Sequence, residues 1–135
     1  MDQKRNHLLA FFAGFVCLTA IDQWTKGLAV DFLKGKGPLA LWDGVFELLY
    51  SENRGAAFGM LQGRQGFFLC VALAVFFFVV YTAVKLPARK RYVPMELCLT
   101  MIMAGAAGNL IDRVSQGYVV DCLYVKLINF PIFNV

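Results

Sequence analysis

Charge is scarce in this sequence. Charged residues make up 16% of its 135 residues and hydrophobic residues 59%, whereas a soluble domain carries about 25% charged residues. The composition therefore excludes an ordinary soluble domain and favours a membrane protein. The net charge is only +4, and no basic stripe with interleaved aromatic residues occurs, so we expect no nucleic-acid partner. The length suits a single domain, residues 1–135.

Metal-binding and disulfide motifs are also absent from the sequence. Its only histidine is His7, and its four cysteines show no C-x-x-C or Cys/His spacing. Zinc sites and disulfide frameworks require such patterns. We therefore expect no metal and no cofactor, and we interpret the cysteines as small apolar side chains.

Long hydrophobic runs are what the sequence has instead. A membrane-spanning helix needs about 20 mostly apolar residues, and three segments approach or meet this requirement, namely 8–30, 67–84 and 95–111. We expect a mainly α-helical membrane protein, a bundle of transmembrane helices with a small β-rich part on its outer face.

Basic residues indicate the orientation of these spans. Lys4 and Arg5 precede the first span, and further basic residues crowd the short loop at 85–91. Because cytoplasmic loops are enriched in Lys and Arg, we expect the N-terminus and this loop to be cytoplasmic and residues 31–66 to lie outside, as does everything after about residue 113. A cleaved signal peptide is an alternative for the N-terminus, but no A-x-A site follows the apolar run.

The segment between the first two spans shows a β-hairpin pattern. The sequence PLALW-DG-VFELLY places two β-prone runs around Asp43 and Gly44, and Asp-Gly is a strong signal for a two-residue hairpin loop. The stretch SENRGAAFGMLQG that follows is rich in small residues. We predict a short outer-face sheet over 39–50 and an irregular or half-helical segment after it.

Several polar residues lie late in the apolar spans. Asp22 lies near the end of the first span, and Asn109, Asp112 and Arg113 end the third. Ionisable groups at membrane depth usually face a bundle interior or a wet cavity, and the spacing of the last three places them on one helix face. Structural ion pairs are the alternative, Asp112 with Arg113 and Asp22 with Lys26.

A further carboxylate interrupts a β-prone apolar run. Asp121 follows GYVV and precedes CLYV, with no basic neighbour before Lys126. A functional carboxylate is one interpretation of this pattern, and a solvated loop carboxylate is the other.

Five motifs resemble, in order, the motif blocks of one family. They are DQWTK at 22–26, NRGAAFG at 53–59, GNLIDR at 108–113, VVDCL at 119–123 and FNV at 133–135. The family they resemble is that of the lipoprotein signal peptidases, also called signal peptidase II. The resemblance implies an aspartic peptidase of the bacterial inner membrane with four spanning helices and a β-rich cradle on the outer face. Such an enzyme removes the signal peptide of a prolipoprotein just before the cysteine that carries a diacylglyceryl group.

The resemblance also implies roles for single residues. Asp121 corresponds to the first aspartate of the catalytic pair. The residues that correspond to substrate-binding or supporting groups are Asp22, Asn53, Asn109, Asp112, Arg113 and Asn134. Among these, Asn53 matches an asparagine that contacts the bound peptide or the cyclic peptide antibiotic globomycin. The partners implied are lipid-modified prolipoproteins, globomycin and membrane lipid.

The last motif departs from the family pattern. In the family it reads Phe-Asn, any residue, Ala-Asp-Ser, and its aspartate is the second catalytic carboxylate. Here Phe133 and Asn134 are followed by Val135, and the second aspartate and the fourth span do not appear. We therefore expect either a fragment or a truncated relative of the family. Hydrolysis by carboxylates needs one ionised and one protonated group, which a pair sharing a proton supplies. Asp121 alone cannot fill both roles.

Two other functions are compatible with the residues. A small proton-coupled transporter would use Asp22 or Asp112 as its carrier, although transporters typically show internal repeats and none is visible here. A non-catalytic membrane fragment is the other alternative.

We predict that the 135-residue chain does not process prolipoprotein, whereas a chain extended by Ala-Asp-Ser and a fourth span does. The physical reason is that each general acid or base contributes about 10²–10⁴-fold to the rate. Cleavage of a lipid-modified precursor in membranes measures both chains. Cleavage by the unextended chain would contradict the need for a second carboxylate.

Overall fold

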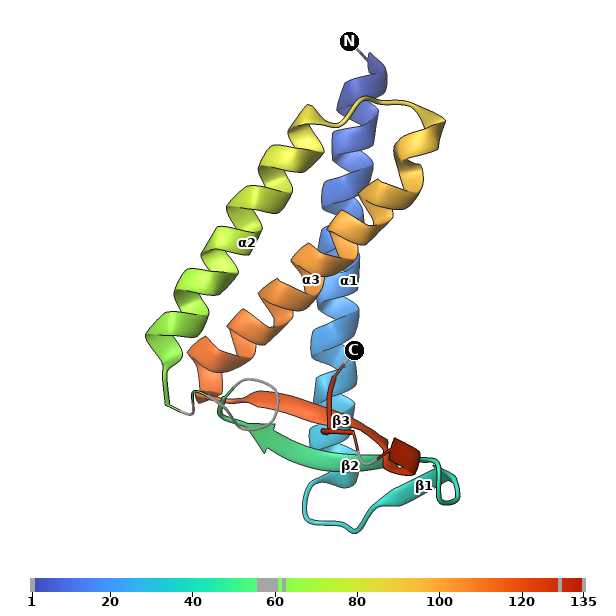
Figure 1. Cartoon of the computed structure of the whole chain (residues 1–135), viewed down its shortest axis with the longest axis vertical. Helices are drawn as coiled ribbons and strands as arrows, with labels where there is room; N and C mark the ends of the chain where they lie inside the picture. Colours follow the sequence, from blue (N-terminus) through green and yellow to red (C-terminus); the bar gives the residue numbers. More distant parts are fainter. Residues whose placement is uncertain (1, 56–60, 62, 129, 135) are drawn as a thin grey trace. The chain divides into compact units, whose positions relative to one another are not determined.

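The computed structural model describes residues 2–55, 61, 63–128 and 130–134. Figure 1 shows the elements in this part of the chain. The helices are α1 (Asp2–Leu33), α2 (Gln65–Lys85) and α3 (Val93–Gln116), with short 3-10 helices η2 (Lys90–Tyr92) and η3 (Lys126–Ile128). The strands are β1 (Leu39–Trp42), β2 (Phe46–Asn53) and β3 (Val119–Val125). Two compact units result, a helical unit of Met1–Asp22 with Gly66–Leu110 and a sheet unit of Gln23–Gln65 with Ile111–Val135.

The three long helices confirm the predicted spans. Among the described residues, three segments are long and apolar enough to cross a membrane: 3–33, 65–85 and 90–116. Each extends beyond the apolar run that predicted it, because flanking residues such as Gln3 and Lys4 are good helix formers and continue the backbone hydrogen bonding. Large apolar side chains of α2, including Phe77 and Phe78, are exposed, as expected of a helix that is apolar all round and spans a membrane.

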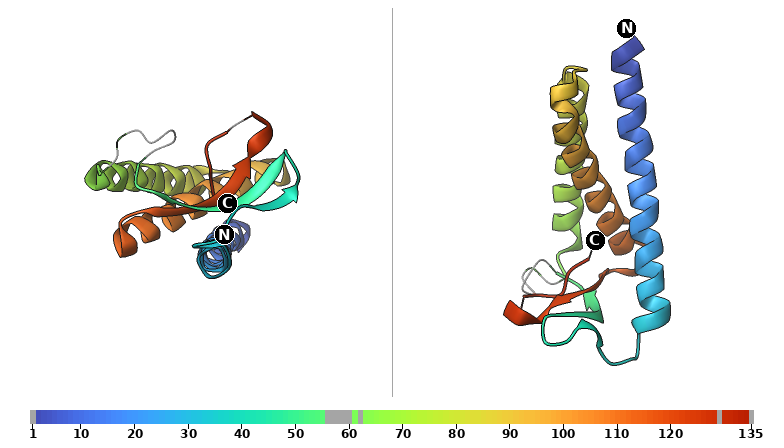
Figure 2. Two further views of the ribbon diagram at one scale, coloured as in Figure 1. Left: turned by 90° about the horizontal axis from the view of Figure 1, so that it is seen from below. Right: turned by 90° about the vertical axis from the view of Figure 1, so that its right-hand side faces the viewer.

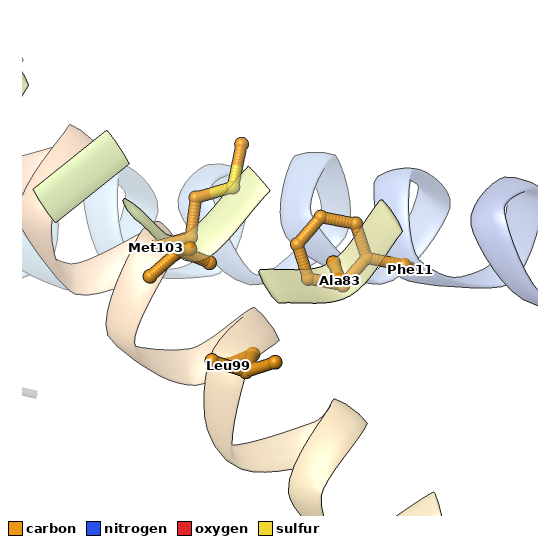
Figure 3. Packing of buried hydrophobic residues seen from close by; sticks show 5 residues of the cluster. Phe11, Ala83, Leu99 and Met103 are labelled. Atoms are coloured by element: carbon orange, nitrogen blue, oxygen red, sulfur yellow. The ribbon is translucent and has the colours of Figure 1, made fainter. Parts of the chain in front are cut away.

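Close packing joins the three helices within the helical unit. The buried residues of this core are Phe11, Val79, Ala83, Leu99 and Met103, four of which are labelled in Figure 3. Each of α1, α2 and α3 contributes at least one of them. Lipid tails are as apolar as these side chains, so such helices associate through close packing and hydrogen bonds rather than through the hydrophobic effect.

The sheet unit contains the predicted hairpin, with a different loop. The strands lie in the order β1-β2-β3 and all pairs are antiparallel, as Figures 1 and 2 show. Trp42 pairs with Phe46, so the loop has one residue more than the predicted two-residue loop. The backbone N–H of Val45 donates to the Trp42 carbonyl at 3.0 Å, and an irregularity between Ala40 and Trp42 shifts the register of the pairing.

Strand β2 is longer than the hairpin pattern predicted. It continues to Asn53, because it pairs with β3 from Phe46 opposite Val125 to Asn53 opposite Val119, with a register shift between Leu48 and Ser51. The irregular or half-helical segment predicted after residue 50 is therefore a strand at first. Its remaining part, at 56–60 and 62, lies outside the described residues.

The core of the sheet unit is built on β3. Its first four residues, 119–122, are all buried, as in strands that are covered on both faces. Val120 and Cys122 form a cluster with Ala29 and Leu33 of α1. Beyond η3 the chain returns along β3, where the backbones of Leu123 and Phe133 exchange hydrogen bonds at 2.8 and 2.9 Å. Figure 1 shows this last segment, in red, beside β3.

Candidate active site

A glycine connects the end of α3 to β3. Gly117 follows directly after Gln116, has a φ of 83°, and donates its N–H to the carbonyl of Arg113 at 3.1 Å. A positive φ at this position favours glycine, which lacks a Cβ atom and commonly ends helices in this way. The sharp reversal places the polar end of α3 and the start of β3 in one corner of the sheet unit.

Asp121 lies in β3 and is only 3% exposed. Its Oδ2 accepts a hydrogen bond from Asn53 Nδ2 at 2.9 Å, and its Oδ1 accepts one from Asn134 Nδ2 at 2.6 Å. The Asn53 Oδ1 atom in turn accepts the N–H of Gly55 at 3.0 Å, which leaves the NH₂ group of Asn53 to face the carboxylate. A solvated loop carboxylate, the alternative interpretation of Asp121, is therefore wrong.

Burial raises the pKa of the Asp121 carboxyl above its ordinary value, because a charged group is disfavoured away from water. The hydrogen bonds from Asn53 and Asn134 oppose this increase in pKa. The positive charges of Lys26 and Arg113 oppose it more weakly. The net result is a carboxyl that takes up a proton more readily than an exposed aspartate, which suits a group that exchanges protons during a reaction.

Asp112 lies near the end of α3 and joins three elements of the sheet unit. Its Oδ2 lies 3.0 Å from Lys26 Nζ of α1 and accepts the backbone N–H of Val120 in β3 at 3.2 Å. Its Oδ1 accepts a hydrogen bond from Gln23 Nε2 at 3.0 Å. With both oxygens engaged in this way, Asp112 is suited to positioning β3 rather than to transferring protons.

Sequence reasoning did not find Lys26 and Gln23 as partners of Asp112. It paired Lys26 with Asp22 on the same helix and considered only Arg113 for Asp112. A signal was nevertheless present, because Gln23 and Lys26 are polar residues at positions i and i+3 of an apolar helix and so share a face.

Arg113 contacts the segment that follows β2. Its Nη2 donates to the carbonyl of Gly55 at 3.0 Å, and Gly55 is buried. The same residue, Gly55, donates its N–H to Asn53. Arg113 thereby holds the backbone next to Asn53, and through it the amide that binds Asp121. This arrangement was not predicted, since no sequence pattern indicates which backbone carbonyl the guanidinium reaches.

Two predicted site residues belong to the helical unit. Asp22, on α1, is buried and lies against the backbone of Gly108 on α3, so closely that a Cβ atom at Gly108 would overlap its carboxylate. Asn109 follows Gly108 on α3 and is half-buried. The sheet unit, by contrast, brings together Asp121, Asn53 and Asn134 directly.

The fold and the site together define a class of protein. Helices able to cross a membrane accompany a buried carboxyl whose two oxygens accept hydrogen bonds from amides. A buried, oriented group of this kind with a raised pKa is typical of acid–base catalysis. The chain is a multi-pass membrane protein with a candidate site for acid–base chemistry.

Comparison with known proteins identifies the family. The sequence profile described as signal peptidase (SPase) II matches residues 14–135. A lipoprotein signal peptidase of Caldanaerobacter subterraneus is 46% identical over 116 residues, which cover 85% of this chain and 77% of the relative. A protein of the same name from Brevibacillus brevis is 41% identical and is covered over 78% of its length, with 87% of this chain matched.

Solved structures agree with these sequence matches. Two structures described as bacterial membrane enzymes, determined by the in meso method at 2.3 and 1.9 Å resolution, superpose with TM-scores of 0.79 and 0.76. Each is 28% identical in sequence and covers 93% of this chain, while this chain covers 76% and 81% of them.

The chain belongs to the signal peptidase II family. Members of this family are aspartic proteases that remove signal peptides from prolipoproteins. This membership decides between the peptidase and the proton-coupled transporter in favour of the peptidase, and it confirms the resemblance carried by the five motifs.

We predict that Gly108→Ala destabilises the protein by about 1–3 kcal/mol, the usual cost of overpacking, because its Cβ atom would overlap the carboxylate of Asp22. Gly105→Ala is the matched control, since a Cβ atom at Gly105 meets nothing within 4 Å and alanine favours the helix by about 0.8–1 kcal/mol. Thermal unfolding in detergent compares the two variants. Equal stability of both would contradict the close approach of Asp22 to Gly108.

Proposed function

We propose that Asp121 is a catalytic carboxylate in the removal of prolipoprotein signal peptides, and that the cut falls just before the lipid-modified cysteine. The observation that carries this proposal is the environment of Asp121, which is 3% exposed and held by amide donors at 2.9 and 2.6 Å. The amides orient both oxygens while leaving the group able to gain and lose a proton.

The proposed reaction uses Asp121 as the general base. The ionised Asp121 takes a proton from a water molecule as the water oxygen attacks the scissile carbonyl carbon. A second, protonated carboxyl donates its proton to the carbonyl oxygen. When the tetrahedral intermediate collapses, the peptide C–N bond breaks, Asp121 gives the proton it accepted to the leaving amine, and the hydroxyl formed from the carbonyl oxygen returns its proton to the second carboxylate. Two nearby carboxylates divide these roles because both cannot ionise cheaply.

The second carboxyl would come from the family's last motif, whose first residues here are Phe133 and Asn134. Two contacts support this part of the proposal. Phe133 pairs with Leu123 of β3, and Asn134 donates a hydrogen bond to Asp121. The motif therefore starts beside the first carboxylate, which is where its aspartate would be needed.

The remaining site residues would support or bind the substrate. Asn53 ends β2 and orients Asp121, so a peptide bound along this strand end would meet its amide. Globomycin is a cyclic peptide, and we propose that it competes for this position. Arg113 holds the adjoining backbone at Gly55. Asp22, Asn109 and Asp112 would act indirectly, by shaping the ends of α1 and α3.

We further propose that the protein lies in the bacterial inner membrane with its N-terminus in the cytoplasm and its active site on the outer face. The support comes from the basic residues Lys4 and Arg5 before the first span and from the basic loop at 85–91, because cytoplasmic loops are rich in Lys and Arg.

Replacement of Asp121 tests the proposed catalytic role. In the chain extended by the family's last motif and fourth span, Asp121→Asn is expected to lower the cleavage rate by about 10²–10⁴-fold while precursor binding persists, because asparagine keeps the shape but exchanges no proton. Processing of a lipid-modified precursor and crosslinking of that precursor measure the two effects at matched membrane abundance. Asp43→Asn, in the exposed hairpin turn, is the control and should cleave at the parent rate. Near-parental cleavage by Asp121→Asn would refute the assignment.

Reporter fusions test the orientation. A reporter that is active only in the cytoplasm should be active when fused at Lys90 and inactive when fused at Gly44, because the positive-inside rule places these loops on opposite sides. The reverse pattern would overturn the outward-facing active site.

A further inference from the structure

We infer that Lys26 is a positioning residue for the reaction, because it holds Asp112 against the backbone of β3 at Val120. This inference rests on the proposed catalytic function of Asp121. The contacts that carry it run from α1 through α3 to β3, all within the sheet unit.

A short chain of contacts connects Lys26 to the residue next to Asp121. Lys26 Nζ lies 3.0 Å from Asp112 Oδ2, and the same oxygen accepts the N–H of Val120 at 3.2 Å. Val120 is 2% exposed and directly precedes Asp121. Because Val120 and Asp121 share a peptide unit, a change in the position of Asp112 is transmitted to the backbone of Asp121.

The ion pair of Lys26 and Asp112 is deeply buried. Both side chains are only 5% exposed. The free energy lost by removing two charges from water often exceeds the free energy gained from their attraction. Well-packed apolar residues in such positions are frequently as stable as the pair or more stable. Stability alone therefore does not account for a lysine here, whereas a role in placing and charging the site does.

Electrostatics gives Lys26 a second route to Asp121. The positive charges of Lys26 and Arg113 oppose the burial that raises the pKa of the Asp121 carboxyl. The described charged groups of this corner are Lys26 on α1 and Asp112 and Arg113 on α3. Strand β2 and the returning C-terminal segment contribute neutral amides to Asp121. The charged Glu52 of β2 pairs with Lys34 and Arg54. Loss of the lysine charge would make Asp121 harder to ionise.

The first test compares two lysine variants in the extended, active chain. Lys26→Met keeps the length of the side chain and removes its charge. We expect kcat to fall on the order of 10²-fold, as for small misplacements of catalytic groups, with little change in KM. We also expect the pH optimum to move upward, because loss of a nearby positive charge raises the pKa of a carboxyl. Lys34→Met is the matched control, because Lys34 is half-exposed and pairs with Glu52. It should keep the parental kcat and pH optimum.

A second pair of variants separates positioning from folding, because Lys26→Met leaves Asp112 buried without its ammonium partner. Asp112→Asn removes that carboxylate while its amide oxygen still accepts the Val120 N–H. We compare Asp112→Asn with the double variant Lys26→Met/Asp112→Asn, neither of which contains an unpaired carboxylate at this position. The double variant is expected to show the higher pH optimum, since only it lacks the lysine charge.

The outcomes distinguish this inference from the proposed function. If Asp121→Asn is inactive but the lysine variants match Lys34→Met in kcat and pH optimum at equal folded abundance, Lys26 is merely structural and the inference fails. Identical pH optima for Asp112→Asn and the double variant would overturn it as well. If Asp121→Asn remains active, the proposed function fails first. Amide hydrogen exchange of β3 should become faster in Lys26→Met. This measurement tests whether Lys26 and Asp112 hold β3 in place, and it does not depend on catalysis.

Discussion

A carboxylate buried in apolar surroundings is stable only when donors surround it, and the sheet unit is organised by this requirement. Asp112 and Asp121 are each 3% exposed. Their donors come from α1, from β2, from the β3 backbone and from the returning C-terminal segment. An unpaired charge there would cost several kcal/mol. The hydrogen bonds and the ion pair of these two acidic groups therefore connect the elements of the sheet unit.

The two carboxylates have different partners, and the difference separates their roles. Asp112 faces the ammonium group of Lys26 at 3.0 Å and forms a buried ion pair with it. Asp121 receives hydrogen bonds from neutral amides, and burial raises its pKa. Pairs of acidic groups whose environments differ in this way divide into a fixed group and an exchanging one. The same residue type therefore serves as a structural brace at one position and as a candidate catalyst at the other.

Local patterns in the sequence predicted much of this fold, but they did not predict contacts between residues far apart in the chain. The apolar runs predicted α1, α2 and α3, and Asp43-Gly44 predicted the hairpin. The loop was one residue longer than predicted because a register irregularity near Ala40 has no sequence signature. The contact of Lys26 with Asp112 joins helices far apart in the chain, and helical spacing cannot reveal such a partner. Motif order identified Asp121, while its amide donors became visible only once β2 and the C-terminal segment lay beside β3.

The short connection through Gly117 constrains the number of residues that can separate Asp112 from Asp121. Asp112 binds the backbone of Val120 eight residues later in the chain, and only Gly117 and Tyr118 separate α3 from β3. Side chains alternate between the faces of a strand, so a shift of one residue turns each side chain to the opposite face. A single inserted or deleted residue in this interval would point Asp121 away from Asn53. Length variation among relatives should consequently be tolerated in the hairpin loop and excluded between these two aspartates.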